Sequence, residues 1–210
     1  MKIRILPSII FSLLLMVSYL ALAQNDDPVV MELAHFLEGF QTYQANFTQT
    51  TYDNKGNIVE ETKGRVMIHR PGQFRWETYQ PTTQIIIVSG QTLWTYDVDL
   101  QQATKRSIDQ KVNLNPASLL SDAPSDLVKQ FVITKNPQKR IFVLKPRNRA
   151  AVNFQELGLR FEQDKLTSMT LVNDLGEISV FTFGKIQINQ SLSPSLFQFK
   201  PPPGVDVITQ

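Results

Sequence analysis

The sequence predicts a mainly β protein, in which an antiparallel sheet is covered on one face by a few short helices. Three observations support this fold class. After one N-terminal helical pattern, the chain shows a series of strand-like runs separated by short turn-forming segments. Helical patterns do not alternate with these runs, which excludes a parallel βαβ arrangement. Several runs are apolar on both faces, as expected for strands that are covered on both sides.

The chain begins with the pattern of a secretory signal peptide. Lys2 and Arg4 precede an apolar run at residues 9–22, and the small residues at 21–23 fit a cleavage site. This run is too short and too early for a good membrane-spanning helix, and no later segment reaches the required length. We therefore expect cleavage after Ala23, export, and no stable membrane insertion. An uncleaved N-terminal anchor is the alternative.

Cleavage would leave a single domain of residues 24–210, which starts with Gln24 rather than the Cys that bacterial lipidation requires. The whole chain has 21 Lys and Arg residues against 19 Asp and Glu residues. Because Lys2 and Arg4 leave with the signal peptide, the mature chain is neutral, which argues against nucleic-acid binding. The absence of Cys excludes disulfides, thiolate metal sites and a Cys nucleophile. We expect a soluble monomer without a cofactor.

The first expected element of the mature chain is a helix near residues 28–40. Asp27 is a good N-cap, and Pro28 suits the first helical position. The periodicity of the apolar residues then defines a single helix face. This face carries Val29, Val30, Leu33, Phe36, Leu37 and Phe40.

Strands follow the helix. A β-rich run extends from Tyr43 to Tyr52, and residues 53–56 (DNKG) form a turn. Residues 89–90 (SG) form a tight hairpin turn between two later runs. The other expected strands lie at residues 58–69, 73–79, 83–89, 92–97, 130–135, 140–145, 154–162, 165–173 and 177–189. Their short connections predict an antiparallel meander.

Two short helices near residues 116–130 interrupt the strands. The first begins at Pro116 and carries Leu119 and Leu120, and the second begins at Pro124. Short helices of this kind rarely stand alone. We expect them to lie, with the N-terminal helix, on one face of the sheet.

The strand-like runs differ in which faces are apolar. Leu157, Leu159 and Phe161 alternate with polar residues, as in a half-solvated strand. The last long run has two apolar faces. One is expected to hold Phe181 and Phe183, and the other Ile178, Val180, Ile186 and Ile188. A second apolar face is compatible with a solid core beneath the helices, and also with an apolar cavity for a lipidic ligand.

Three segments resemble landmarks of one protein family. The block "GRVMIHRPGQFRWETYQP…QIIIVSGQTLWTYDVDLQQ" is similar to the most recognisable part of the outer-membrane lipoprotein carrier proteins, the LolA family. "QANFTQT" near the start and "LFQFKPPPGVDVI" near the end match two further landmarks, so the similarity runs through nearly all of the mature chain. The resemblance implies an incomplete, strongly curved antiparallel β-barrel with an α-helical lid over an apolar cavity.

The resemblance also implies a function. Family members are chaperones that cross the periplasm of Gram-negative bacteria with lipoprotein acyl chains held inside. They collect this cargo from an inner-membrane ABC transporter and pass it to an outer-membrane lipoprotein receptor. Two alternatives stay open. One is a periplasmic lipid binder or envelope-stress sensor with the same fold, and the other is an exported hydrolase.

The resemblance assigns roles to individual residues. Arg70 matches an arginine that hydrogen-bonds the lid backbone when the cavity is empty, although without the family it would be expected at the surface. Phe74 matches a residue implicated in cargo transfer. The residues expected to line the acyl cavity are Phe47, Trp76, Ile86, Trp94, Leu119, Leu120, Phe181 and Phe183. For the aromatic residues among them an ordinary core position is the alternative, and Arg75 is expected to face solvent.

The hydrolase alternative depends on carboxylate pairs. Asp97 and Asp99 share a strand face and Glu60 and Glu61 are adjacent, so either pair could serve glycoside chemistry. The two histidines lack nearby carboxylates with metal-site spacing, and the chain contains no G-x-S-x-G motif. Because no complete catalytic constellation is present, we expect no enzyme activity.

Overall fold

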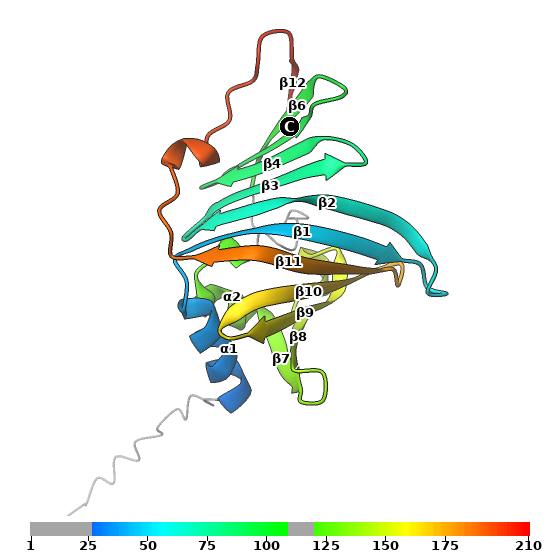
Figure 1. Cartoon of the computed structure of the whole chain (residues 1–210), viewed down its shortest axis with the longest axis vertical. Helices are drawn as coiled ribbons and strands as arrows, with labels where there is room; N and C mark the ends of the chain where they lie inside the picture. Colours follow the sequence, from blue (N-terminus) through cyan, green and yellow to red (C-terminus); the bar gives the residue numbers. More distant parts are fainter. Residues whose placement is uncertain (1–26, 109–119) are drawn as a thin grey trace, which may run out of the picture.

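The computed structural model describes residues 27–108 and 120–210. The expected signal peptide with its cleavage site, Leu119, and the start of the helical segment expected at 116–130 lie outside the described residues. Within the described part, one strongly curved sheet is covered on its inner face by helices, as Figure 1 shows. The prediction of a mainly β protein with one open, curled sheet is confirmed.

Two antiparallel meanders make up most of the sheet. The first contains β1 (Thr42–Tyr52), β2 (Ile58–His69), β3 (Gln73–Gln80), β4 (Gln84–Ser89), β5 (Thr92–Asp97) and β6 (Gln102–Ser107). The second contains β7 (Phe131–Asn136), β8 (Ile141–Pro146), β9 (Phe154–Glu162), β10 (Lys165–Asn173) and β11 (Ile178–Ile188). Because β11 pairs with β1, the meanders form one sheet with the order β12-β6-β5-β4-β3-β2-β1-β11-β10-β9-β8-β7.

The edge strand β12 (Asp206–Thr209) departs from the expected meander because it pairs with β6 in parallel. The sequence patterns predict neither β12 nor β6. Between β11 and β12 the chain forms the 3₁₀ helix η3 (Pro194–Phe197), which packs on β3 and β4. We term residues 190–205 the outer strap. The prediction of a wholly antiparallel sheet is therefore wrong at this edge.

The helix α1 (Pro28–Glu38) begins where the sequence predicts. The Asp27 side chain accepts a hydrogen bond from the backbone N–H two residues later (2.9 Å), which satisfies one free donor of the first turn. The apolar face of the helix packs on the sheet. There the Phe36 ring stacks on Phe161 of β9 at a centroid distance of 4.9 Å.

The second helix, α2 (Pro124–Gln130), also begins at the expected proline. Its N-cap, Ala123, offers no side-chain hydrogen bond, but Asp126 in the first turn complements the positive end of the helix. Leu127 is buried, and α2 contacts both α1 and β7. We term α1, α2 and the adjoining Leu120 the inner cover.

A bulge in strand β11 changes which of its side chains point to the inner face of the sheet. Lys185 has a φ of 52°, and the pairing of β11 with β1 shifts at this point. A bulge adds one residue to one strand and so reverses which side chains face inward. Ile186 and Ile188 therefore pack against the same core as Phe183. The prediction that these isoleucines face the opposite way is wrong.

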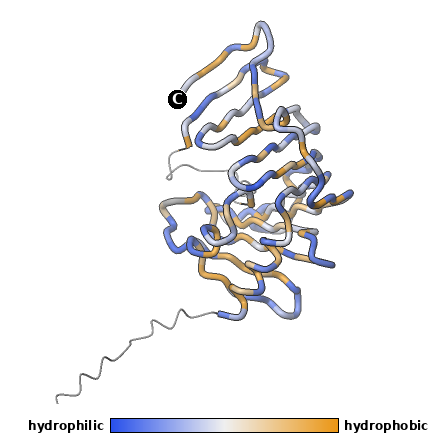
Figure 2. Tube along the Cα trace, turned by 90° about the vertical axis from the view of Figure 1, so that its left-hand side faces the viewer, coloured by the Kyte–Doolittle hydropathy of each residue, from blue (hydrophilic) through white to orange (hydrophobic). Residues whose placement is uncertain are grey.

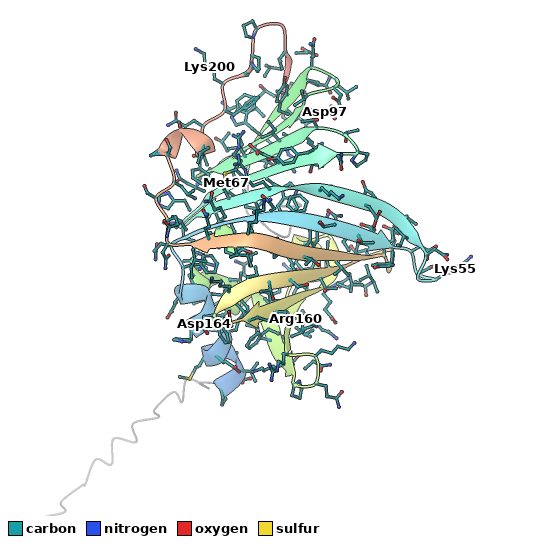
Figure 3. The ribbon with its side chains drawn as sticks, in the orientation of Figure 1. Lys55, Met67, Asp97, Arg160, Asp164 and Lys200 are labelled. Atoms are coloured by element: carbon teal, nitrogen blue, oxygen red, sulfur yellow. The ribbon has the colours of Figure 1, made fainter. Side chains whose placement is uncertain are left out.

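The hairpin loops β1–β2 and β10–β11 have the same construction. In each, the side chain of the first residue, Asp53 or Asn173, accepts hydrogen bonds from the backbone N–H groups two and four residues later. Gly56 and Gly176 occupy the fourth position with φ of 85° and 82°, a conformation that glycine adopts readily. Figure 3 places Lys55, in the first loop, at the end of the sheet far from the inner cover.

The inward side chains of the strands form one apolar core between the sheet and the inner cover. Figure 2 shows polar and apolar residues interleaved along the strands. Phe74 and Trp76 of β3 belong to the buried core, as do Leu157, Leu159 and Phe161 of β9. The alternation predicted for β9 is thus confirmed.

Candidate functional site

An aromatic wall lines the inner face of the sheet. The Phe47 ring stacks on Trp76 at 3.9 Å, and Trp76 meets Phe181 edge to face at 5.5 Å. Phe183 belongs to the same core, and Ile86 packs at its margin. The structure therefore brings these five predicted cavity residues together. In this closed arrangement side chains pack closely beneath the inner cover.

Arg70 connects the sheet to the end of α1 and to Leu120, which precedes α2 in the inner cover. It is only 6% exposed, so it is not the surface arginine that the sequence alone would suggest. Its guanidinium donates hydrogen bonds to the carbonyl oxygens of Leu37 and Phe40 at the end of α1, and to that of Leu120 at 2.8 Å. Helix ends leave such carbonyls without partners, and the guanidinium fork can satisfy several at once. The Arg70 guanidinium also lies 3.8 Å from the centroid of the Phe40 ring.

Arg70 holds the inner cover through uncharged acceptors, while an ion pair between Lys135 of β7 and Glu32 of α1 adds a charged contact at 2.5 Å. Among the described residues, Arg70 makes no direct ion pair. Burial lowers the pKa of Arg70 to about 10, and the nearby charge of Asp122 opposes this shift. Burial also raises the pKa of Asp122 to about 6, with a further rise from Asp126 and an opposing effect from Arg70. Arg70 therefore remains charged at neutral pH.

The C-terminal end of α1 is also tied to β11 by Asn189. The Asn189 side chain accepts a hydrogen bond from the Gln41 N–H (2.8 Å) and donates one to the Gly39 carbonyl (3.0 Å). The Gln41 carbonyl in turn accepts from the backbone N–H of Arg70 at 2.9 Å. Sequence reasoning missed Asn189, because no local pattern marks a side chain that binds a helix end about 150 residues away.

Arg75 holds the outer strap on the opposite face of β3. Its guanidinium donates to Glu77 at 2.6 Å and to the Leu196 carbonyl of the strap at 3.0 Å. Arg65 and Tyr79 also donate to Glu77, at 3.1 and 2.7 Å. The Arg75 side chain is only 17% exposed, so the prediction that it faces solvent is wrong.

Glu77 is the centre of this outer cluster. Burial alone would raise the pKa of Glu77, but hydrogen bonds from Tyr79 and Arg75 and the charges of Arg75 and Arg65 together lower its pKa below the ordinary value. The carboxylate is therefore charged at neutral pH and compensates two arginines. Such charge-assisted hydrogen bonds are stronger than bonds between neutral groups.

Trp94 lies beneath the outer strap and not beneath the inner cover. It is opposite Ile87 in the pairing of β5 with β4, and Ile87 is opposite Arg75, which places all three on the outer face. The Trp94 ring lies 5.0 Å from Phe199 of the strap, and Phe197, also in the strap, is fully buried. The prediction that Trp94 lines the acyl cavity is therefore wrong.

The carboxylates considered for hydrolysis have local contacts. Asp97 and Asp99 each accept a hydrogen bond from a backbone N–H in the adjoining loops, at 3.1 and 3.2 Å. Glu60 and Glu61 are exposed on β2. In the described part of the chain, no group of three or more His, Cys, Asp or Glu residues is placed to hold a metal ion. Nor does any helix of that part have the length and apolar character needed to cross a membrane.

Comparisons with known proteins match the chain to one family. Residues 38–200 match the family model for the outer membrane lipoprotein carrier protein LolA. The chain is 46% identical over 210 residues to an outer-membrane lipoprotein carrier protein of Coxiella burnetii, with 99% of each chain covered. It is 37% identical over 190 residues to the protein of that name from Azotobacter vinelandii, covering 90% of this chain and 91% of that one.

The fold also has a counterpart among solved structures. An uncharacterized conserved protein from Thermus thermophilus superposes with a TM-score of 0.52 at 14% identity. The superposition covers 86% of this chain and 98% of that chain. At this level of identity the likeness concerns the fold alone.

Proposed function

The chain belongs to the LolA family of outer membrane lipoprotein carrier proteins, and we propose that it carries lipoproteins across the periplasm with their acyl chains beneath the inner cover. A signal peptide cleaved after Ala23 directs its export, and residues 24–210 form the mature domain. An inner-membrane ABC transporter supplies the cargo, and an outer-membrane lipoprotein receptor accepts it. The cycle consists of binding and release, so the chain acts as a chaperone and not as an enzyme.

The cost of exposing acyl chains explains why a carrier is needed. Each methylene group in water costs about 0.8 kcal/mol, so two or three long chains cost on the order of tens of kcal/mol. The carrier must cover the chains without binding them too tightly. Transfer to a receptor that uses no energy source requires the receptor to bind the cargo more strongly than the carrier does. A cover that opens and closes meets both requirements.

The observation that carries the proposal is the set of hydrogen bonds from Arg70 to the inner cover. Because side chains pack closely beneath the closed cover, acyl chains enter only when α1 and α2 move away and these bonds break. A hydrogen bond from a charged donor contributes about 1.5–3 kcal/mol. We infer that Arg70 acts as a latch, which favours the empty, closed carrier and so promotes release.

The latch is tested with Arg70→Leu in a purified carrier and receptor assay. The variant is expected to load lipoprotein from inner-membrane vesicles as well as the unmodified chain, but to transfer it poorly, because release no longer restores the bonds of the closed form. Arg149→Leu is the matched control, since Arg149 is exposed and, among the residues that the structure describes, forms an ion pair only with Asp174 on the surface. Equal transfer by all three proteins would remove the latch role. Failure of the unmodified chain to load lipoprotein would instead favour a sensor with the same fold.

Phe74 is the proposed transfer residue. It is fully buried in the closed form, with its ring 6.1 Å from Trp76 on the strand that follows Arg70. Opening of the cover would uncover this ring to a partner or to cargo. Phe74→Ala is expected to slow transfer in vesicle assays at a temperature where it stays folded. Phe154→Ala removes an equally buried ring elsewhere in the core and is expected to leave transfer unchanged.

A further inference from the structure

A pocket lies at the junction of α2, β7 and β8, apart from the aromatic wall. Its volume is about 240 Å³. Phe131, Pro146 and Val152 supply its apolar surface, and Lys129 and Arg147 lie at its margin. A cavity with apolar walls and a few polar groups at one side is typical of a small-ligand site.

The floor of this pocket is continuous with the protein core. Phe131 is buried and stacks on Phe154 at 6.1 Å, and Val152 packs against the core cluster. The Arg147 N–H donates to the Gln130 carbonyl at 2.9 Å, which joins the end of α2 to the end of β8. The pocket therefore has fixed walls in the same closed state in which Arg70 holds the inner cover.

The margin of the pocket is positively charged. Lys129 pairs with Asp126 at 3.6 Å, but both side chains are largely exposed, so this pair is weak. Arg147 makes no ion pair with the described residues. Two cations beside an apolar pocket favour a ligand that joins a hydrocarbon chain to an anionic group.

We propose that this pocket binds one hydrocarbon chain of an anionic amphiphile, either a fatty acid carboxylate or the phosphate-bearing part of a lipid. The chain lies on Phe131, Pro146 and Val152, and the head group lies between Lys129 and Arg147. The site is separate from the acyl site beneath the inner cover and goes beyond the carrier role, because it is open while that cover is closed.

The site is tested by titration calorimetry of the mature chain with single-chain amphiphiles below their micellar concentrations. Dodecyl phosphate and dodecanoate are expected to bind with one ligand per chain. Dodecyltrimethylammonium, which has the same chain but a cationic head, is expected to bind about 5- to 10-fold more weakly. Inorganic phosphate alone is expected not to bind, and its binding with equal affinity would show a simple anion site and overturn the proposal.

Variants locate the bound amphiphile. The double variant Lys129→Glu, Arg147→Glu is expected to lose about tenfold in affinity for dodecyl phosphate, whereas Lys139→Glu, in the exposed β7–β8 turn, serves as the matched control and is expected to change nothing. Val152→Trp fills the pocket and is expected to abolish binding; circular dichroism checks that it folds. Equal binding by all variants would place the amphiphile beneath the inner cover and reject the site. Lipoprotein loading by the same variants reports the carrier function separately, since the pocket variants are expected to load normally.

Discussion

Two arginines five residues apart hold covers on opposite faces of the same sheet. Arg70 binds the inner cover through backbone carbonyls alone, without a carboxylate partner among the described residues. Arg75 binds the outer strap through the Leu196 carbonyl and is itself held by Glu77. The two side chains thus make the same kind of contact with a covering segment, but only the outer one belongs to an ion-pair network.

The difference indicates which cover moves. Breaking the bonds of Arg70 leaves a charged side chain that water can hydrate as the helices leave, and the carbonyls it releases are neutral. Arg75 is fixed on β3 by Glu77, and the strap it binds is also anchored by the fully buried Phe197 and by the pairing of β12 with β6. We therefore expect the inner cover to open while the outer strap stays in place, so that one face of the sheet exchanges ligands and the other remains fixed.

The largest effect is expected from a change that disturbs the packing of the inner face. A Cβ atom at Gly64 would lie 1.9 Å from the Glu77 carbonyl oxygen and 2.5 Å from Cζ of Phe47. Gly64→Ala is therefore expected to lower the free energy of unfolding by about 3 kcal/mol, measured by urea denaturation. Gly184→Ala is the control, because a Cβ there would meet no atom within 4 Å. Similar stability of the two variants would contradict the close packing of the inner face.

The next largest effect is expected in the outer cluster around Glu77. Glu77→Gln keeps the size of the side chain but leaves Arg75 and Arg65 without their carboxylate, so we expect a loss of about 2 kcal/mol in the free energy of unfolding. In the described part of the chain, Glu156→Gln breaks a single exposed ion pair, with Lys145, and is expected to change stability by less than about 0.5 kcal/mol. Equal stability of these two variants would show that the cluster around Glu77 contributes no more than an exposed ion pair.

Hydrogen exchange can measure the opening of the inner cover and of the outer strap separately. Arg70→Leu is expected to raise the exchange rates of amides in α1 and α2 by about tenfold or more, because the local opening of these helices becomes easier. The amides of η3 and β12 are expected to keep their rates. Arg75→Leu is expected to give the reverse pattern. Exchange that rises across the whole sheet in either variant would show that the covers do not open independently.

The smallest effect is a pH dependence of the inner cover. The pKa of Asp122 is raised from its ordinary value of 3.8 to about 6 in the folded chain. Its favourable contribution is therefore present below about pH 4 and is lost as pH rises through about 6. Compared with Asp122→Asn, the unmodified chain is expected to lose up to about 1 kcal/mol of stability between pH 5 and pH 7. Glu77 shifts in the opposite direction, so its contribution is lost only at acidic pH.

Much of the fold is readable from local patterns. The N-cap Asp27, the proline that begins α2 and the alternation in β9 depend on residues close in sequence, and each prediction agrees with the structure. The face that a strand residue occupies is harder to predict. The predictions for Trp94 and Ile186 are wrong about the face, because an outer strap and a bulge are decided by segments distant in the chain.

Prediction of the candidate site from local sequence patterns is limited in the same way. The motif around Arg70 identifies the side chain, but only the fold shows that its acceptors are the carbonyls of Leu37, Phe40 and Leu120. Arg75 offers no signal of its own in the sequence, since its partners lie two residues away at Glu77 and 121 residues away at Leu196. The role of each arginine is therefore set by contacts with residues that are distant in the chain.

The paired hairpin loops at the far end of the sheet have a practical consequence. Asp53 and Asn173 close these loops through their own side chains, so the loops do not depend on either cover for their shape. A spectroscopic label at Lys55 would thus mark a reference position that does not move with either cover. The distance between this label and a second label on α1 would then measure how far that helix moves when cargo binds and when it is released.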